Sequence, residues 1–143
     1  MMPKITAILH GQDKSNGDYY HRVLWPYQGL SEHLSVEIVQ MTHPDVYLKA
    51  AQAELLIIHM ISDEGLLEVV KHRRKNRRPT ITEISDDFEN FPPQTMLHHF
   101  YAQKENQERI IEFMKSSHGV QFSSPFLEQK YQQYTNNTHV FMN

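Results

Sequence analysis

The sequence predicts an α/β fold: a Rossmann-like, doubly wound, mainly parallel six-stranded sheet with helices on both faces. Three observations lead to this prediction. Short apolar runs alternate with longer segments whose apolar residues recur every three or four positions. The run AELLIIHM, residues 53–60, is continuously apolar, as expected for a central parallel strand covered on both sides. The length of 143 residues suits one domain, so residues 1–143 are expected to form a single Rossmann-like unit.

The six expected strands are short apolar or alternating runs, most of them closed by turn residues or polar loops. They are expected at residues 4–10, 35–41, 53–60, 79–85, 119–123 and 138–142. Because helical segments separate them, the connections should be right-handed crossovers, which produce a parallel sheet.

The expected helices cover residues 18–34, a short segment that opens at Pro44 or Asp45, the segment from Asp63 into the basic run, residues 94–117, and residues 125–134. Pro26 lies inside the first of these and is expected to kink or split it. Ser62 or Asp63 can cap the third helix, and Pro125 suits the first position of the last one.

Composition excludes several classes of protein. The chain has no cysteine, so disulfides and thiolate metal sites are excluded. No segment approaches the roughly 20 apolar residues that cross a bilayer, so we expect no stable membrane insertion and a cytoplasmic location.

Charge is unevenly distributed along the chain. Six of the 14 Lys and Arg residues lie in Lys71–Arg78, and the remaining eight bases stand against 17 acids, a net charge of −9. The basic run could bind nucleic acid, or it could be the solvated cationic end of a helix, where the helix dipole favours Lys and Arg. Without interleaved aromatic residues or an RNA-binding motif, we favour the helix end and expect no nucleic acid partner.

Ligands of doubly wound sheets bind beyond the carboxyl ends of the strands. Asp86 and Asp87 follow the fourth expected strand at this edge. Successive residues point in different directions, so we expect one of them to face a cleft and the other to cap a turn or pair with a base. The pair fits a plain turn, a catalytic role, or a magnesium or manganese site. No third ligand is evident and no paired histidine spacing occurs, so we expect no metal.

Two other groups lie at the same edge. His59, at the end of the third expected strand, suits hydrogen bonding or proton transfer, or a structural role. The loop from Gly11 to Gly17 follows the first strand and is either a binding loop or an ordinary surface loop. It matches neither the dinucleotide fingerprint nor the Walker A motif.

Five segments, taken in order, resemble a known family: DYYHRVLWPYQGL, AELLIIHM, RRPTITEISDDFENFPP, HGVQFSSPFLEQKY and THVFMN. They are similar to the N-terminal, acceptor-side domain of retaining glycosyltransferases of the GT-B architecture (group 1, glycogen-synthase-like), which have two Rossmann-like domains. The chain departs from the family near His118 and Gly119, where an aspartate is usual, and its first loop lacks paired glycines.

The resemblance implies that this chain shapes the acceptor side of an interdomain cleft. Asp86, with Asp87 as the alternate, would contact or orient an acceptor hydroxyl. The pocket would be lined by Gly11, Gly17, Tyr20, Arg22 and His59, and Arg22 could hold a phosphate or carboxylate. Such enzymes usually work without a bound metal, so no cofactor is expected.

The expected partners are a sugar acceptor and a nucleotide-sugar donor, the donor being held by a second, C-terminal domain that these 143 residues lack. The alternative is a non-catalytic Rossmann-like binding or regulatory interaction module. A receiver-like version would need a phosphoacceptor aspartate where His59 stands, which counts against that version.

Overall fold

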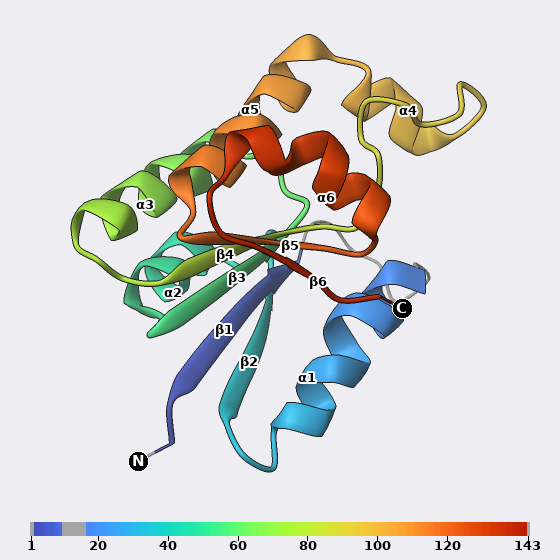
Figure 1. Cartoon of the computed structure of the whole chain (residues 1–143). Helices are drawn as coiled ribbons and strands as arrows, with labels where there is room; N and C mark the ends of the chain where they lie inside the picture. Colours follow the sequence, from blue (N-terminus) through green and yellow to red (C-terminus); the bar gives the residue numbers. More distant parts are fainter. Residues whose placement is uncertain (1, 10–16, 143) are drawn as a thin grey trace.

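The computed structural model describes residues 2–9 and 17–142. It contains one sheet of six strands, all parallel, with the order β2-β1-β3-β4-β5-β6 (Figure 1). The strands are β1 (Lys4–Leu9), β2 (Ser35–Gln40), β3 (Leu55–His59), β4 (Thr80–Ile84), β5 (Gly119–Phe122) and β6 (Thr138–Val140). The predicted α/β, doubly wound, six-stranded sheet is therefore confirmed, with strand ends that differ from the expected ones by one or two residues.

The strand order places a topological switch point between β1 and β3. The connection from β1 leads to β2 on one side, and the chain then returns past β1 to β3 and continues to the other edge. In such sheets the crevice beyond the carboxyl ends of the two central strands is where ligands bind. His59 ends β3 at this point, and residues 17 and 18 lead into the helix that follows β1.

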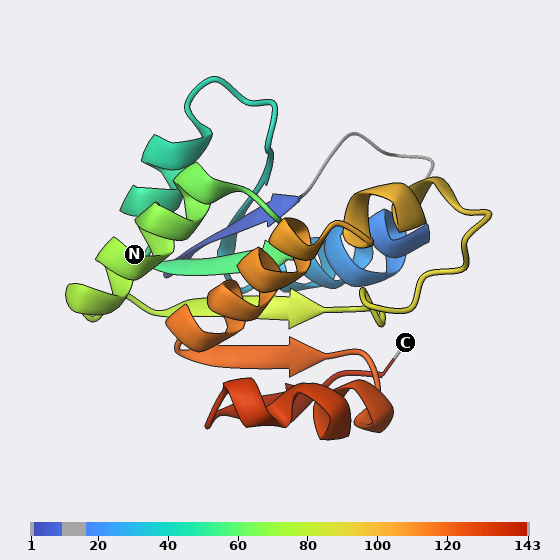
Figure 2. The same ribbon diagram turned by 90° about the horizontal axis from the view of Figure 1, so that it is seen from above.

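The two faces of the sheet are covered unequally (Figures 1 and 2). One face carries η1 (Tyr19–Leu24) and α1 (Trp25–Leu30), packed on β1, β2 and β3 through Tyr19, Val23 and Tyr27. The other face carries α2 (Val46–Gln52), α3 (Glu64–Lys75), α5 (Lys104–Ser116) and α6 (Pro125–Tyr131), the last followed by the 3₁₀ turn η2 (Gln132–Tyr134). Among the described residues, η1 also reaches β4 at Ile81 and Glu83, whereas β5 and β6 have no helix packed on this first face.

The first expected helix is divided at Pro26, as predicted. Tyr19–Leu24 form a π-helical turn, and the α-helix begins at Trp25 with Pro26 in its first turn. The proline ring cannot donate to the carbonyl one turn earlier and would clash with it, so the preceding turn widens. The wider turn sets which side chains of η1 reach the sheet.

The expected single helix over 94–117 is wrong: the structure has α4 (Met96–Tyr101) and α5 (Lys104–Ser116), separated at Gln103. Gln103 has an extended backbone, with φ −70° and ψ 121°. The buried side chain of Asn106 donates a 2.8 Å hydrogen bond to the carbonyl of Phe100, and so satisfies a group that a continuous helix would satisfy through its own backbone.

The basic run is the end of α3, as favoured, but it is not simply solvated. Asp63 caps the helix by accepting a 2.7 Å bond from the Leu66 amide. Arg73, ten residues later, is fully buried. Its guanidinium donates to the Thr80 hydroxyl at 2.9 Å and to main-chain carbonyls, including Ala53 at 2.7 Å. Arg73 therefore joins α2, α3 and β4 at the amino edge of the sheet.

No helix within 2–9 and 17–142 combines the length and the apolar character needed to span a membrane.

Candidate functional site

Strand β4 sends alternate side chains toward η1. Ile81 packs with the cluster under η1, whereas Thr82 bonds to the carbonyl of Phe113 in α5 on the opposite face. Since side chains alternate along a strand, Glu83 and Ser85 share the η1 side with Ile81. On this side of β4, the hydrophobic Ile81 is thus followed by the polar Glu83 and Ser85, which face η1.

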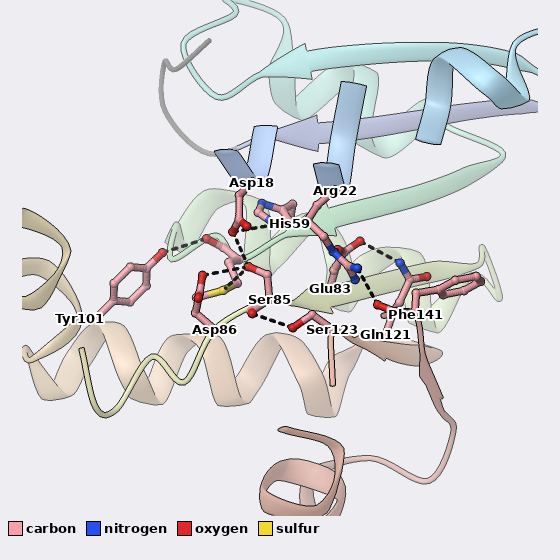
Figure 3. A network of polar contacts seen from close by, with 11 residues as sticks. Asp18, Arg22, His59, Glu83, Ser85, Asp86, Tyr101, Gln121, Ser123 and Phe141 are labelled. Carbon is pink, nitrogen blue, oxygen red and sulfur yellow. Dashed lines mark hydrogen bonds and ion pairs between the residues drawn. The ribbon is translucent and has the colours of Figure 1, made fainter. Parts of the chain in front are cut away.

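Asp18, Ser85 and Asp86 form the centre of the site (Figure 3). The Ser85 hydroxyl lies 2.7 Å from Asp18 Oδ2 and 3.2 Å from Asp86 Oδ2. It has only one hydrogen to donate, so the two carboxylates compete for it. Two acidic side chains from segments far apart in sequence therefore lie on either side of one hydroxyl. Asp18 and Asp86 together will be called the carboxylate pair.

Two further groups border the carboxylate pair. His59 Nε2 lies 3.6 Å from Asp18 Oδ2, and the histidine side chain is buried. Met60, the next residue, has φ 39°, a left-handed conformation that is uncommon outside glycine. The Tyr101 hydroxyl from α4 donates to the Met60 carbonyl at 3.3 Å, and the Met60 amide donates to the Glu83 carbonyl at 3.0 Å. Bonds from both sides thus hold the strained turn beside the site.

Burial raises the pKa of Asp86 to about 6, and the neighbouring negative charge of Asp18 adds to the effect. The hydrogen bond from Ser85 and the positive charge of Arg22 act in the opposite direction. Two carboxylates close together cannot both ionise freely, so the charge of Asp18 favours the neutral form of Asp86. A carboxylate of this kind can accept a proton near neutral pH.

Arg22 and Glu83 lie beside the carboxylate pair (Figure 3), and both are buried. Arg22 Nε donates to Glu83 Oε1, and its Nη1 donates to the Phe141 carbonyl at 2.6 Å. Glu83 also accepts from Gln121 Nε2 at 2.9 Å. Burial raises the pKa of Glu83 to about 7, although the charge of Arg22 opposes this shift. Arg22, expected to hold an anionic ligand group, is instead bonded to the protein's own carboxylate.

Asp87 points away from the carboxylate pair, toward α6. It accepts from Lys130 Nζ at 2.6 Å, from the Tyr131 hydroxyl at 2.7 Å and from Asn90 Nδ2 at 2.9 Å. Burial alone would raise the pKa of Asp87, but these three bonds lower it. The two adjacent acids thus point in different directions, with Asp86 beside Ser85 and Asp87 paired with Lys130.

Two further expected site residues, Gly17 and Tyr20, flank Asp18 in the sequence. Tyr20 packs edge-on against Tyr19, at 5.2 Å between ring centroids, and lies 5.7 Å from Trp25. Gly17 is exposed, and a Cβ added at this position would meet no atom within 4 Å, so the packing of the chain does not require a glycine there. Gly11 lies outside the described residues. His59 and Asp86 are therefore the expected residues that the fold brings together.

Sequence reasoning missed Asp18, Ser85 and Glu83. Asp18 was taken only as the start of a helix, and Ser85 and Glu83 as parts of a strand. The alternation of side chains along a strand could have placed Glu83 and Ser85 on one face, together with His59, the polar residue that ends the neighbouring strand β3. The partner helix could not be oriented without knowing that the turn before Pro26 is π-helical.

The geometry fits a site that binds a hydroxyl-bearing ligand. The carboxylate oxygens accept hydrogen bonds, the Ser85 hydroxyl can rotate to donate or accept, and Asp86 can take up a proton. Within the described ranges no three His, Asp or Glu side chains are grouped as a metal site would require.

No family model and no curated protein matches this chain. Among solved structures, the chain is similar to a conserved protein from Enterococcus faecalis V583, with a TM-score of 0.46 and 11% sequence identity over 100% of this chain and 92% of that one. The assignment of fold and site rests on the chain's own strand order and contacts.

Proposed function

We propose that this chain is the acceptor-side domain of a nucleotide-sugar-dependent glycosyltransferase, and that the carboxylate pair binds the acceptor hydroxyl. The observation that carries the proposal is the placement of Asp18 and Asp86 on either side of the Ser85 hydroxyl, at the carboxyl edge beside the switch point. The resemblance of the five sequence segments to the N-terminal domain of retaining glycosyltransferases supports the same proposal.

The proposed roles follow from the chemistry of each group. Asp86 accepts the hydrogen bond of the incoming hydroxyl, and takes its proton as the new glycosidic bond forms and the nucleotide diphosphate leaves. Its pKa of about 6 suits that step. Asp18 orients the hydroxyl, and His59, 3.6 Å away, faces the Asp18 carboxylate. The donor would be supplied by a second domain, as the resemblance to two-domain glycosyltransferases implies.

The test is a binding titration of the isotope-labelled chain with a panel of mono- and disaccharides, followed by amide chemical shifts. We expect a saccharide to perturb residues around Ser85 and Asp86, and Asp86→Asn to weaken its binding about tenfold or more, since a bond to a charged acceptor is lost. Asp45→Asn, an exposed carboxylate change at α2, is the matched control. Perturbations that map elsewhere, or unchanged binding in Asp86→Asn, would contradict the proposal.

A second candidate function is a non-catalytic Rossmann-like interaction module. It is favoured by the uncovered face of β5 and β6, beside which Leu55, Ile81 and Phe141 help to line a groove of about 420 Å³. Parallel sheets are usually covered on both faces. The two candidates differ in the full-length natural protein: transfer of sugar from a nucleotide-sugar, lost in Asp86→Asn, supports the enzyme, and the absence of turnover with the whole donor panel supports the module.

A further inference from the structure

Two polar connections join the segment at η1 to the end of β4, side by side (Figure 3). Asp18 bonds to Ser85, and Arg22, four residues later, bonds to Glu83, two residues earlier on the strand. Four residues are about one turn of the helix, and two residues are one repeat of the strand. The spacing of the two connections therefore matches on both elements.

The connection between Arg22 and Glu83 is strongly anchored. Arg22 and Glu83 are 6% and 1% exposed, so both side chains are out of water. Glu83 is held from β5 by Gln121 at 2.9 Å, and Arg22 reaches the Phe141 carbonyl beyond β6 at 2.6 Å. A planar guanidinium that binds two acceptors in fixed directions has little freedom to move. The start of η1, and Asp18 with it, is thus fixed relative to β4.

The same arginine affects the charge of the site. Asp18 and Asp86 are two acids in one partly buried location, and a positive charge nearby makes their joint ionisation less costly. Burial raises the pKa of Asp86 and that of Glu83, and the positive charge of Arg22 acts to lower both. The charged and titratable groups around this location are Asp18, Arg22, Tyr27, His59, Glu83, Asp86 and Tyr101.

We propose that Arg22, anchored by Glu83, is a positioning residue that holds Asp18 against Asp86 and balances the negative charge of that pair. The inference rests on the proposed function for its biological meaning, because Asp18 and Asp86 are the carboxylates proposed to bind the acceptor hydroxyl. It assigns Arg22 a role within the protein rather than in direct contact with a ligand.

The experiment follows the side-chain carboxyl carbon of Asp86 by NMR across a pH titration of the chain. In Arg22→Gln the titration midpoint of Asp86 should rise by about 1 pH unit, because a nearby opposite charge is removed. In Glu83→Gln it should change much less, because Glu83, with a pKa of about 7, is largely protonated at the pH where Asp86 titrates. A rise in Arg22→Gln without a comparable change in Glu83→Gln follows from the charge of Arg22 and does not follow from a general loosening of the fold.

Two further variants complete the test. Arg22→Lys keeps the charge without the planar fork and should return the midpoint toward the wild-type value. The double variant Arg22→Met with Glu83→Gln removes both buried charges, which a core tolerates better than one unpaired charge. It therefore serves if Arg22→Gln does not fold, and its Asp86 midpoint should also rise. Lys49→Gln, which breaks the remote pair with Glu37, is the control.

An Asp86 midpoint that stays at the wild-type value in Arg22→Gln, or in the folded double variant, would overturn the inference. The titration needs no substrate, so its result is separate from that of the saccharide panel. A raised Asp86 midpoint in Arg22→Gln without saccharide binding would keep the inference and remove the proposed function. Saccharide binding with an unchanged Asp86 midpoint in Arg22→Gln would do the reverse.

Discussion

Ser85 Oγ lies 2.7 Å from Asp18 Oδ2, although 67 positions separate the two residues in the sequence. This bond closes the site, because it joins the start of the helix after β1 to the end of β4. It also places the Asp86 carboxylate 3.2 Å from the same hydroxyl. The contact between the first and fourth strand-to-helix connections is thus made by one small side chain.

Ser85→Ala should raise the titration midpoint of Asp86. The Ser85 hydrogen bond lowers the pKa of Asp86 against the stronger effect of burial, so its loss leaves the neutral acid favoured over a wider pH range. We also expect the free energy of unfolding to fall by about 1 kcal/mol, a typical value for one lost hydrogen bond. Carboxyl-carbon NMR and urea unfolding measure the two effects.

Ser31→Ala provides the matched control for this change. Its hydroxyl bonds to the Gln28 carbonyl on the exposed surface and should affect neither quantity beyond a few tenths. An Asp86 midpoint that falls in Ser85→Ala would show that the hydroxyl does not stabilise the ionised form.

Substitutions of the two adjacent acids, Asp86 and Asp87, should have different effects on stability and on saccharide binding. Asp87→Asn should lower the free energy of unfolding by about 1–2 kcal/mol, because Lys130 and Tyr131 lose a charged acceptor, and should leave saccharide binding unchanged. Asp86→Asn should weaken saccharide binding, and it should not destabilise the chain, because it removes a carboxylate whose ionisation burial opposes. Urea unfolding and the saccharide titration, run on both variants, check this. Equal effects of the two variants on binding would contradict the division of roles.

The sequence was sufficient for the sheet and for part of the site. Continuous apolar runs and their turn residues are local features, so they predicted six strands and the edge at which Asp86 and His59 lie. The division of Asp86 from Asp87 followed from the alternating directions of successive residues. These inferences needed no knowledge of distant contacts.

The parts that failed depend on contacts between distant segments. The break between α4 and α5 is associated with the buried side chain of Asn106, which bonds to the carbonyl of Phe100, and neither residue is a helix breaker by itself. Arg22 was read as a ligand-binding cation because its buried partner, Glu83, lies 61 positions away. Arg73 was read as part of a solvated helix end, since sequence does not reveal that backbone carbonyls from two neighbouring elements converge on it.

Arg73→Ala should be strongly destabilising, by about 3–5 kcal/mol, because it opens a cavity and leaves several buried carbonyls without donors. Arg73→Lys should recover only part of the loss, because an ammonium cannot reach acceptors in the same plane as a guanidinium does. Lys75→Ala, an exposed change in the same helix, should stay within about 0.5 kcal/mol. Urea unfolding measures all three, and a loss in Arg73→Ala no larger than in Lys75→Ala would contradict the structural role.

Stability should fall as the pH rises from about 4 to about 7, over the range set by Asp86 and Glu83. Burial raises the pKa of Asp86 from 3.8 to about 6 and that of Glu83 from 4.5 to about 7. At a pH between the pKa values of the unfolded and folded states, the folded chain binds more protons than the unfolded chain. These two groups therefore contribute their full stabilisation at a pH below the unfolded-state pKa, and this stabilisation is lost as the pH rises through the folded-state pKa.

Urea unfolding at about pH 5 and about pH 8 measures this loss. Asp86→Asn should reduce the difference between the two pH values, because the amide does not titrate. Glu37 has a pKa lowered by its bond to Lys49, and the pKa of Asp87 is also lowered, so both act in the opposite direction, but only at lower pH. A wild-type chain that is more stable at the higher pH, or an Asp86→Asn variant with an undiminished difference, would show that the carboxylate pair is not protonated as the buried geometry requires.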